Sequence, residues 1–474
     1  MNKDSTLDRF LEESESSTEG NNSKLDPKVL TGVSDEWKKT PLAEVADDRE
    51  NSFVDGPFGA NLLSEEYHDE GFARTIKLQN IRSGRFINTN KKYITEEKFK
   101  ELERHSAYPT EIAIAKMAKP VARACILPDF ESQYILAAAD VVKLDTGENF
   151  SNVFVMYSLN SYPVWKQAFS RSRGTGRKRI NLNQLKEVQI PTPPLLEQRK
   201  IATVLYTVDR AIEKSKEIET QLERTQKGLI QDFLAHGLQG SETKDTATKL
   251  GEIPSHWDVV TIENILSDDD YSFTDGARYS LSSDEIRENG DARAILLEEV
   301  KEGEFDDSNP KFATGEKYKE ITHRAIYPGE VVVAKMAEPV ARACIVPDTY
   351  EKYLLGCADV VRIVPNEEIE DRFLMYCMNS HKVWRQAVAH LRGTGRSRIN
   401  LENISELYIP KPPLSEQREI VSVLSGIDQQ IDNEQQYRNN LQRLKLGLQQ
   451  DLLSVTVRTT DTNIEVPDEI AQHG

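Results

Sequence analysis

The chain has few cysteines and no long apolar run. Its 474 residues contain only four Cys, and none of them stands in a CxxC pair or near His at zinc-ligand spacing. We therefore expect neither a disulfide nor a bound metal, and we expect Cys125 and Cys344 to be buried thiols. No segment approaches the apolar length that crosses a bilayer, and the first residues lack the basic and apolar regions of a signal peptide. These absences favour a cytoplasmic protein.

Recognisable catalytic and cofactor-binding motifs are also missing. No glycine-rich loop follows a predicted strand in the way that a dinucleotide site requires, and no Walker A lysine motif is present. The segments PTPP (191–194) and PKPP (410–413) resemble the Asn/Asp-Pro-Pro-aromatic motif of amino-methyltransferases, but both lack the acidic or amide residue and the aromatic. No His-Asp-Ser set or carboxylate pair stands out. We therefore expect no catalytic residues and no cofactor-binding residues in this chain.

Positive charge is in the minority. The chain has 60 Lys and Arg against 78 Asp and Glu, which gives a formal net charge of −18. Net charge governs solubility and long-range attraction, whereas a nucleic-acid site needs only a local basic surface. The acidic balance therefore does not exclude DNA binding.

A long internal repeat is the main feature that the chain does contain. Residues 111–234 recur without a gap at 330–453. KMAKPVARAC returns as KMAEPVARAC, RGTGRKRINL as RGTGRSRINL, and PPLLEQRKI as PPLSEQREI. Each unit is far longer than a solenoid repeat, and it occurs only twice. The pattern indicates a duplicated domain that makes two similar contacts at two places on one long partner.

Each copy combines a mixed globular region with a long helical one. Apolar runs at 111–118, 134–144 and 187–193 predict strands, while 95–105 and 152–170 predict helices. We predict an α/β or α+β domain present twice, each copy followed by a long α-helix. The two long helices are predicted to form an antiparallel coiled coil and a pseudo-two-fold dumbbell. The alternative is that each helix packs only on its own domain.

The domain boundaries follow from composition and from the proline-rich ends of the predicted strands. The predicted order is a disordered acidic N-terminal tail (1–34), a first globular domain (35–195), a first long helix (196–237), a linker (238–254), a second globular domain (255–414), a second long helix (415–456) and a loose C-terminal tail (457–474).

The densest positive charge lies in one Gly/Arg loop of each copy, within residues 171–186 and 385–401. Glycine lets the backbone approach a ligand closely, and guanidinium groups suit phosphate oxygens or the guanine edge. The alternative is a flexible, solvated loop. The predicted DNA-binding residues of these loops are Arg173, Gly174, Arg177 and Arg179 in the first copy and Arg392, Gly393, Arg396 and Arg398 in the second.

Four further basic residues precede these loops. For the two arginines among them, an internal ion pair with Asp140 or Asp359 in the next strand is an equally weighted alternative. The four candidates for phosphate contact are Lys116 and Arg123 in the first copy and Lys335 and Arg342 in the second.

The order of these elements resembles the specificity subunit of type I DNA restriction–modification systems. The resemblance covers residues 37–454. The second copy departs from the first at FTDGARYSL (273–281) and at LEEV (297–300). The motifs that carry the resemblance are FVDGPFGANL (53–62), LQNI (78–81), the Gly/Arg loops, IPTPPLLEQRKIA (190–202) and IPKPPLSEQREIV (409–421).

The resemblance implies a non-catalytic subunit that binds double-stranded DNA. Its two target-recognition domains would each recognise half of a split sequence, and its long helices would form the spacer and dock two methyltransferase subunits. Restriction subunits that translocate DNA would join in the full complex. S-adenosylmethionine, and ATP with Mg²⁺ for restriction, would bind to those partners and not to this chain. The alternative function is a tandem-domain coiled-coil scaffold that does not bind DNA.

Base recognition and backbone contact are expected to lie in different parts of each domain. The first forty or so residues of the two copies differ more than the rest, so we expect base discrimination mainly within 51–90 and 271–310. The shared Gly/Arg loops would then contact mainly the DNA backbone.

Overall fold

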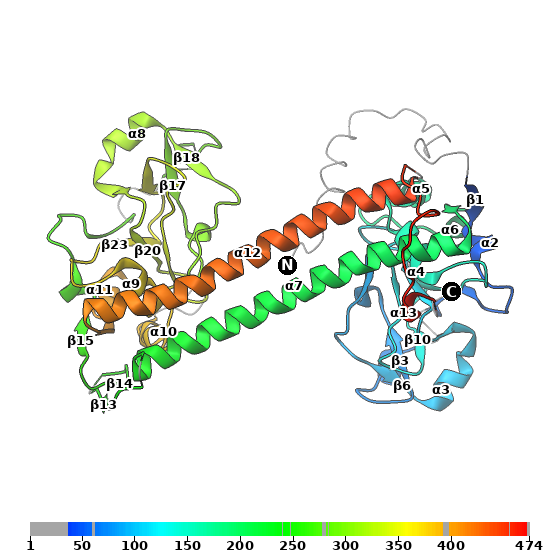
Figure 1. The fold of residues 1–474 in the computed structure, drawn as a ribbon, viewed down its shortest axis with the longest axis horizontal. Helices are drawn as coiled ribbons and strands as arrows, with labels where there is room; N and C mark the ends of the chain where they lie inside the picture. The colour runs from blue at the N-terminus through cyan, green and yellow to red at the C-terminus, as the bar shows by residue number, and fades with distance from the viewer. Residues whose placement is uncertain are drawn as a thin grey trace. The chain divides into compact units, whose positions relative to one another are not determined.

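The structure, a computed structural model, describes residues 37–58, 62–238, 240–246, 248–276, 281–282, 284–391, 398–454 and 456–471. The chain divides into two compact units: unit 1 comprises Met1–Lys216 and Gln436–Gly474, and unit 2 comprises Glu217–Gln435. The predicted tail 1–34 lies outside the described residues. Each unit contains one globular domain and parts of two long helices, α7 (Leu195–His236) and α12 (Leu414–Leu453), which Figure 1 shows as unbroken.

The globular domain of unit 1 mixes short strands and short helices. Its strands are β1 (Lys38–Pro41), β2 (Phe53–Asp55), β3 (Ala73–Ile76), β4 (Ile81–Arg82), β5 (Arg85–Phe86), β6 (Tyr93–Ile94), β7 (Ser106–Ala107), β8 (Ile112–Ala115), β9 (Ala124–Ile126), β10 (Tyr134–Leu136), β11 (Val141–Leu144) and β12 (Gln189–Thr192). Its helices are α2 (Leu42–Val45), α3 (Glu96–Glu101), α4 (Asn152–Leu159), α5 (Tyr162–Arg171) and α6 (Leu182–Lys186). The predicted mixed helix-and-sheet class is confirmed.

Two four-stranded sheets form this domain, in the orders β6-β3-β10-β7 and β2-β11-β8-β9. Strands β3 and β10 run parallel, whereas β8 is antiparallel to both β9 and β11. The antiparallel pair β1 and β12 brings the strand that opens the domain beside the strand that closes it. The single strand predicted over 134–144 is wrong, because β10 and β11 belong to different sheets and a turn separates them.

Alternation along β8 explains how one strand contributes to two cores. Ile112 and Ile114 enter the cluster that packs under α4, α5 and α7, while Ala113 and Ala115 enter the cluster between the two sheets. Successive side chains of a strand point to opposite faces, so a continuous apolar run is what a strand buried on both faces requires. Val331–Ala334 of unit 2 divides its side chains between two clusters in the same way.

Antiparallel packing of α7 and α12 is visible inside each unit. In unit 1 the first turns of α7 place Ile201 and Leu205 in the core that also contains Leu452 of α12. In unit 2 the last turns of α7 place Phe233 in the core that also contains Ile420 near the start of α12. Each unit therefore pairs one end of α7 with the opposite end of α12, as the predicted antiparallel coiled coil requires.

The PPLxEQ motif at the start of each long helix has a structural explanation. Gln198 is fully buried; its amide donates to the carbonyls of Pro193 and Asn149, and its carbonyl accepts from the backbone of Ser151. Gln417 makes the corresponding contacts at the start of α12. These bonds fix the direction in which each helix leaves its domain, because they join the first helical turn to a loop of the globular core.

The C-terminal segment packs on unit 1, so the prediction of a loose tail is wrong. The Arg458 guanidinium donates to both carboxylate oxygens of Glu197, at 2.8 and 3.0 Å. Lys200 donates to the carbonyls of residues 459, 460 and 462, and Ile470 of the short helix α13 (Asp468–Ala471) is buried in the core of unit 1. The segment therefore completes this domain.

Unit 2 repeats the arrangement with its own closing segment. The predicted linker forms the pair β13 (Thr243–Asp245) and β14 (Glu252–Pro254). Glu416, the counterpart of Glu197, accepts from the Trp257 indole at 2.9 Å. The remaining strands are β15 (Asp258–Thr261), β16 (Phe273–Asp275), β17 (Ala292–Ile295), β18 (Lys311–Ala313), β19 (Ala325–Ile326), β20 (Val331–Ala334), β21 (Ala343–Ile345), β22 (Tyr353–Leu355), β23 (Val360–Ile363) and β24 (Tyr408–Lys411), and the helices are α8 (Gly315–Glu320), α9 (Asp371–Met378), α10 (His381–Ala389) and α11 (Leu401–Ser405).

The sheets of unit 2 have the orders β16-β23-β20-β21 and β18-β17-β22-β19, and β15 pairs with β24. This is the topology of unit 1, except that a single bridge between Val300 and Phe305 takes the place of the small β4–β5 pair. Within the part of the chain that the structure describes, none of the helices combines the length and the apolar character that a membrane span needs.

Candidate nucleic-acid interface

The Gly/Arg loop of unit 1 is a closed turn that presents basic side chains to solvent. Its ends meet where Arg173 and Arg179 exchange two backbone hydrogen bonds of 2.9 Å. Gly174 has a φ of +119°, and a Cβ at this position would lie 2.6 Å from the carbonyl oxygen of Arg177. Only glycine fits such a position without strain. Arg173 and Arg177 are exposed, so the turn has the defined shape and the accessible charge that phosphate contacts require.

The base of this loop is bound to the sheet behind it. The backbone amide of Ile180 donates to the carbonyl of Lys116 at 3.0 Å. Arg179 Nε lies 2.5 Å from Asp140 Oδ1, and about half of the arginine side chain, 49%, stays exposed. A guanidinium has five N–H donors, so Arg179 can keep its contact with Asp140 while other donors face a ligand.

Lys116 lies beneath the loop and does not face solvent. Its side chain is 4% exposed, and its ammonium group is 2.7 Å from the Asp55 carboxylate. Asp55 ends β2 and Lys116 follows β8, so the ion pair joins two strands that both border β11. The structure therefore places Lys116 in a buried ion pair rather than at the surface, where a phosphate contact would lie. Lys335 is likewise buried and paired with Asp275.

Arg123 is also a structural residue. Its side chain is buried, and its guanidinium donates to the backbone carbonyls of residues 78, 81, 117 and 120 at 2.8 to 3.2 Å. Arg342 makes the corresponding contacts with the carbonyls of residues 297, 300, 336 and 339. The predicted phosphate contact of these two arginines is therefore replaced by bonds that hold the segments LQNI and LEEV in place.

The expected ion pairs of Asp140 and Asp359 involve a different arginine in each domain. Asp140 pairs with Arg179, and Asp359 pairs with Arg398 at 2.9 Å. Arg398 also donates to the carbonyl of residue 358. The other predicted residues of the second loop, Arg392, Gly393 and Arg396, lie outside the described residues. The two domains therefore share one geometry, in which the carboxylate directly before β11 or β23 binds the last arginine of the loop.

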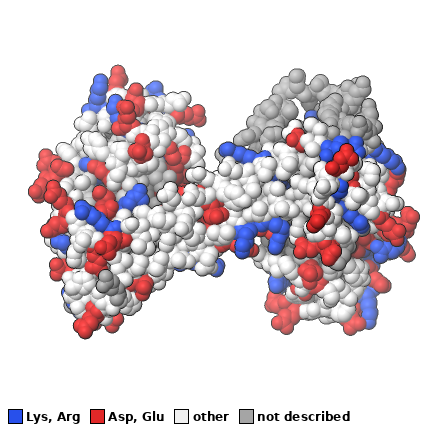
Figure 2. Space-filling view, in the orientation of Figure 1, with Lys and Arg blue, Asp and Glu red and all other residues white. Residues whose placement is uncertain are grey.

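Basic side chains do not form one continuous field on the visible surface. On the face drawn in Figure 2, the described Lys and Arg residues are interspersed with Asp and Glu in both units. Any DNA contact on this face would therefore be made by local groups of basic residues.

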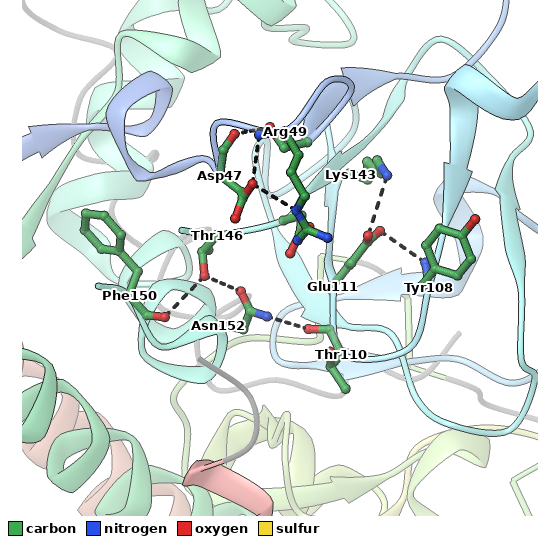
Figure 3. Close-up of polar contacts among 11 residues, drawn as sticks. Asp47, Arg49, Tyr108, Thr110, Glu111, Lys143, Thr146, Phe150 and Asn152 are labelled. Carbon is green, nitrogen blue, oxygen red and sulfur yellow. Dashed lines mark hydrogen bonds and ion pairs between the residues drawn. The ribbon is translucent and has the colours of Figure 1, made fainter. Parts of the chain in front are cut away.

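A second polar cluster lies at the other end of β8 and β11 (Figure 3). Arg49 contacts Asp47 and Asp145, and the Thr146 hydroxyl donates to Asn152 at 2.7 Å. Glu111 accepts from the backbone amide of residue 108 at 3.1 Å and lies 3.5 Å from the Lys143 ammonium. Burial raises the pKa of Glu111 to about 7, although the Lys143 charge acts in the opposite direction. Glu111, Lys143 and Asn152 are buried, whereas the Arg49 side chain is exposed, and the cluster lies at the end of the domain away from the Gly/Arg loop.

The raised pKa of Glu111 predicts a pH dependence of stability. In the unfolded chain this carboxyl titrates near 4.5, and in the folded chain it titrates near 7. The folded state therefore binds the proton more tightly, and this contribution to stability is complete below pH 4.5 and is lost as the pH rises through about 7. We expect the melting temperature of the native protein, relative to Glu111→Gln, to fall between pH 5 and pH 8. Exposed Glu97→Gln is the matched control, and an unchanged difference across this pH range would contradict the assignment.

Comparison with known proteins adds independent information about the whole chain. The family model of the type I restriction modification DNA specificity domain matches residues 135–224 and 254–443. Over 443 residues the chain is 23% identical to the type I restriction enzyme MjaVIII specificity subunit of Methanocaldococcus jannaschii, which covers 91% of this chain and 95% of that protein. Over 416 residues it is 22% identical to the type I restriction enzyme EcoKI specificity subunit of Escherichia coli, which covers 85% of this chain and 86% of that protein.

A solved structure shows a similar fold. The S subunit of the type I restriction–modification system from M. genitalium aligns with a TM-score of 0.52 at 14% sequence identity, over 91% of this chain and 98% of that one. At this level of identity the likeness concerns the fold alone.

Proposed function

The chain belongs to the family of type I restriction modification DNA specificity domains, and we propose that it recognises a split sequence in double-stranded DNA, one half-site with each globular domain. One observation carries this proposal. Both domains hold an arginine of the Gly/Arg loop on a carboxylate in the same way, Arg179 on Asp140 and Arg398 on Asp359. A loop whose last arginine is held alike in two domains suits a ligand that offers the same backbone chemistry at two places.

The long helices are proposed to set the spacing of the half-sites and to dock two methyltransferase subunits. In support, several large apolar side chains of these helices are exposed and available to a partner. In the full complex, restriction subunits would join, with S-adenosylmethionine, ATP and Mg²⁺ bound to the partners. The exposed apolar residues are Leu196, Ile218, Val423, Tyr437 and Leu444.

The proposal predicts that Arg177→Ala weakens binding to every DNA sequence by a similar factor, roughly three- to tenfold. The slope of the logarithm of the binding constant against the logarithm of the salt concentration should become shallower by about one. Arg177 is exposed at the tip of the loop, so its loss removes a charge without opening the core. Filter binding of the complex with methyltransferase subunits, at several salt concentrations, measures both quantities. Lys100→Ala, an exposed cation of α3 paired with Glu96, is the control. A change in the preferred base would show that Arg177 recognises sequence.

The function itself is tested by the methylation pattern of the source genome together with a gel-shift assay. A split motif with methyl-adenine in both halves supports the proposal and defines the target. If the chain together with its methyltransferase subunits fails to bind duplexes that carry this motif, it is instead a scaffold that does not recognise DNA.

A further inference from the structure

Phe58 has the largest exposed fraction among the large hydrophobic side chains that the structure describes, at 71%. Single exposed apolar residues are common at protein surfaces. Phe58, however, lies at the end of a segment that is otherwise firmly packed, since Pro57 and Gly56 immediately before it are buried. A phenyl ring has no polar group that water can bind, so its exposure next to a buried backbone needs an explanation.

The backbone that carries Phe58 is bound to the domain at several points. The Gly56 amide donates to the carbonyl of Val141 at 2.8 Å, and a Cβ on Gly56 would clash with the carbonyl oxygen of Ala138. One residue earlier, the Asp55 carboxylate binds Lys116, and the Asp55 carbonyl is 2.6 Å from the His105 ring. Because Pro57 also fixes its own φ, Phe58 leaves a rigid support.

The same turn of the domain supports the Gly/Arg loop. Residues 137–140 connect β10 to β11, with Gly56 packed against the carbonyl of Ala138 and Arg179 paired with Asp140. One short turn therefore supports both features. The segment that carries the exposed Phe58 ring packs on Ala138, and the loop that carries the exposed arginines is bound to Asp140. Cations that bind phosphates beside an apolar ring that contacts bases are a common combination in DNA-binding proteins.

We propose that Phe58 is a specificity-determining residue of unit 1, whose ring makes an apolar contact with a base of the half-site that this unit binds. This inference rests on the proposed function. The ring suits either the methyl group of thymine in the major groove or an exposed base face at a flexible step. The contact is placed by the backbone of Asp55 and Gly56, while Arg173 and Arg177 bind the neighbouring phosphates.

In unit 2 the residues before the position equivalent to Phe58 are held in the same way, but the sequence has a different residue at that position. Asp275 binds Lys335, and a Cβ on Gly276 would clash with the carbonyl oxygen of Cys357, as in unit 1. Two residues after this glycine the sequence has Arg278, where unit 1 has Phe58; residue 278 lies outside the described part of the chain. An apolar ring and a guanidinium group prefer different bases, so the two half-sites should differ at the base pair that this position contacts.

The test uses the full chain with its methyltransferase subunits and a duplex that carries the motif found by genomic methylation. Phe58→Ala should weaken binding to this duplex about tenfold or more, while affinity for a duplex without the motif and the salt dependence of binding remain unchanged. Changing a base pair in the half-site of unit 1 should cost the variant less affinity than it costs the native protein. Changing a base pair in the other half-site should cost both proteins the same. Uracil in place of thymine, and 2-aminopurine fluorescence, then identify whether the ring contacts the methyl group or a base face.

Phe130→Ala is the matched control. Phe130 is also an exposed phenylalanine, at 58%, but it lies in the β9–β10 connection, which begins beside Glu111 at the opposite end of β8. Both variants should melt at the native temperature. Equal losses on both duplexes, or no loss with Phe58→Ala while the native complex binds its motif, would overturn the inference alone. Absence of motif binding by the native complex would overturn the proposed function as well.

Discussion

Replacement of Arg123 by alanine is expected to lower the free energy of unfolding of unit 1 by about 3–5 kcal/mol. The guanidinium satisfies four backbone carbonyls at 2.8 to 3.2 Å inside the domain. Its removal takes the side-chain donor from these acceptors, of which the Leu78 carbonyl still accepts from the Ile81 amide. Each buried group that loses its partner costs about 1–3 kcal/mol. Thermal melting with peptide-resolved hydrogen exchange would assign the loss to unit 1.

Arg177→Ala is the natural comparison for this variant, since Arg177 is exposed and its loss should leave the melting temperature unchanged. Arg342→Ala should produce the corresponding loss in unit 2. An Arg123→Ala protein that melts like the native one but binds DNA more weakly would restore the role in phosphate binding that the sequence suggested.

Removal of the residues after Ser454 is expected to destabilise unit 1 by about 3–6 kcal/mol. The deletion takes away the guanidinium that neutralises Glu197, whose side chain is 2% exposed, and the carbonyls that accept from Lys200. It also uncovers the part of the core where Ile470 is buried. Hydrogen exchange should therefore accelerate in α4 and in the first turns of α7.

Unit 2 provides the internal control for this deletion. Its counterpart of Glu197 is Glu416, which is bound by Trp257 and His256 of the chain's own middle segment. Exchange in β20 and β23 should therefore keep its native rate. Equal acceleration in both units, or none in either, would show that the C-terminal segment does not complete the domain of unit 1.

Local patterns in the sequence predicted where helices and strands occur better than where one element ends and the next begins. The long helices follow from a sustained heptad pattern, and their observed bounds differ from the predicted ones by only a few residues. The helix predicted over 152–170 is in fact two, because Pro163 suits the first turn of a new helix and cannot continue an old one. The break between β10 and β11 falls in the stretch AAAD, which contains neither glycine nor proline, so no local signal marks it.

Partners that are distant along the chain explain the errors at the candidate site. The exposure of Arg173 and Arg177 was predictable because a run of Gly and Arg favours a solvated turn. The burial of Lys116 was not, since its partner Asp55 is 61 residues away. Arg458 and Glu197 are 261 residues apart, and nothing in the composition of either segment points to the other. Ion pairs of this kind depend on the tertiary fold.

The bonds of Arg123 and Arg342 have an evolutionary consequence. Each arginine binds main-chain oxygens of its neighbouring segment, and LQNI and LEEV present carbonyls at the same positions with different side chains. Substitutions in such a segment keep the carbonyls that this arginine binds, because every residue type offers the same carbonyl group. Asn80 and Glu299 are exceptions in another respect, since their side chains also support their segments. Under the proposed function, a change of target preference through such a segment would need no change in the arginine that supports it.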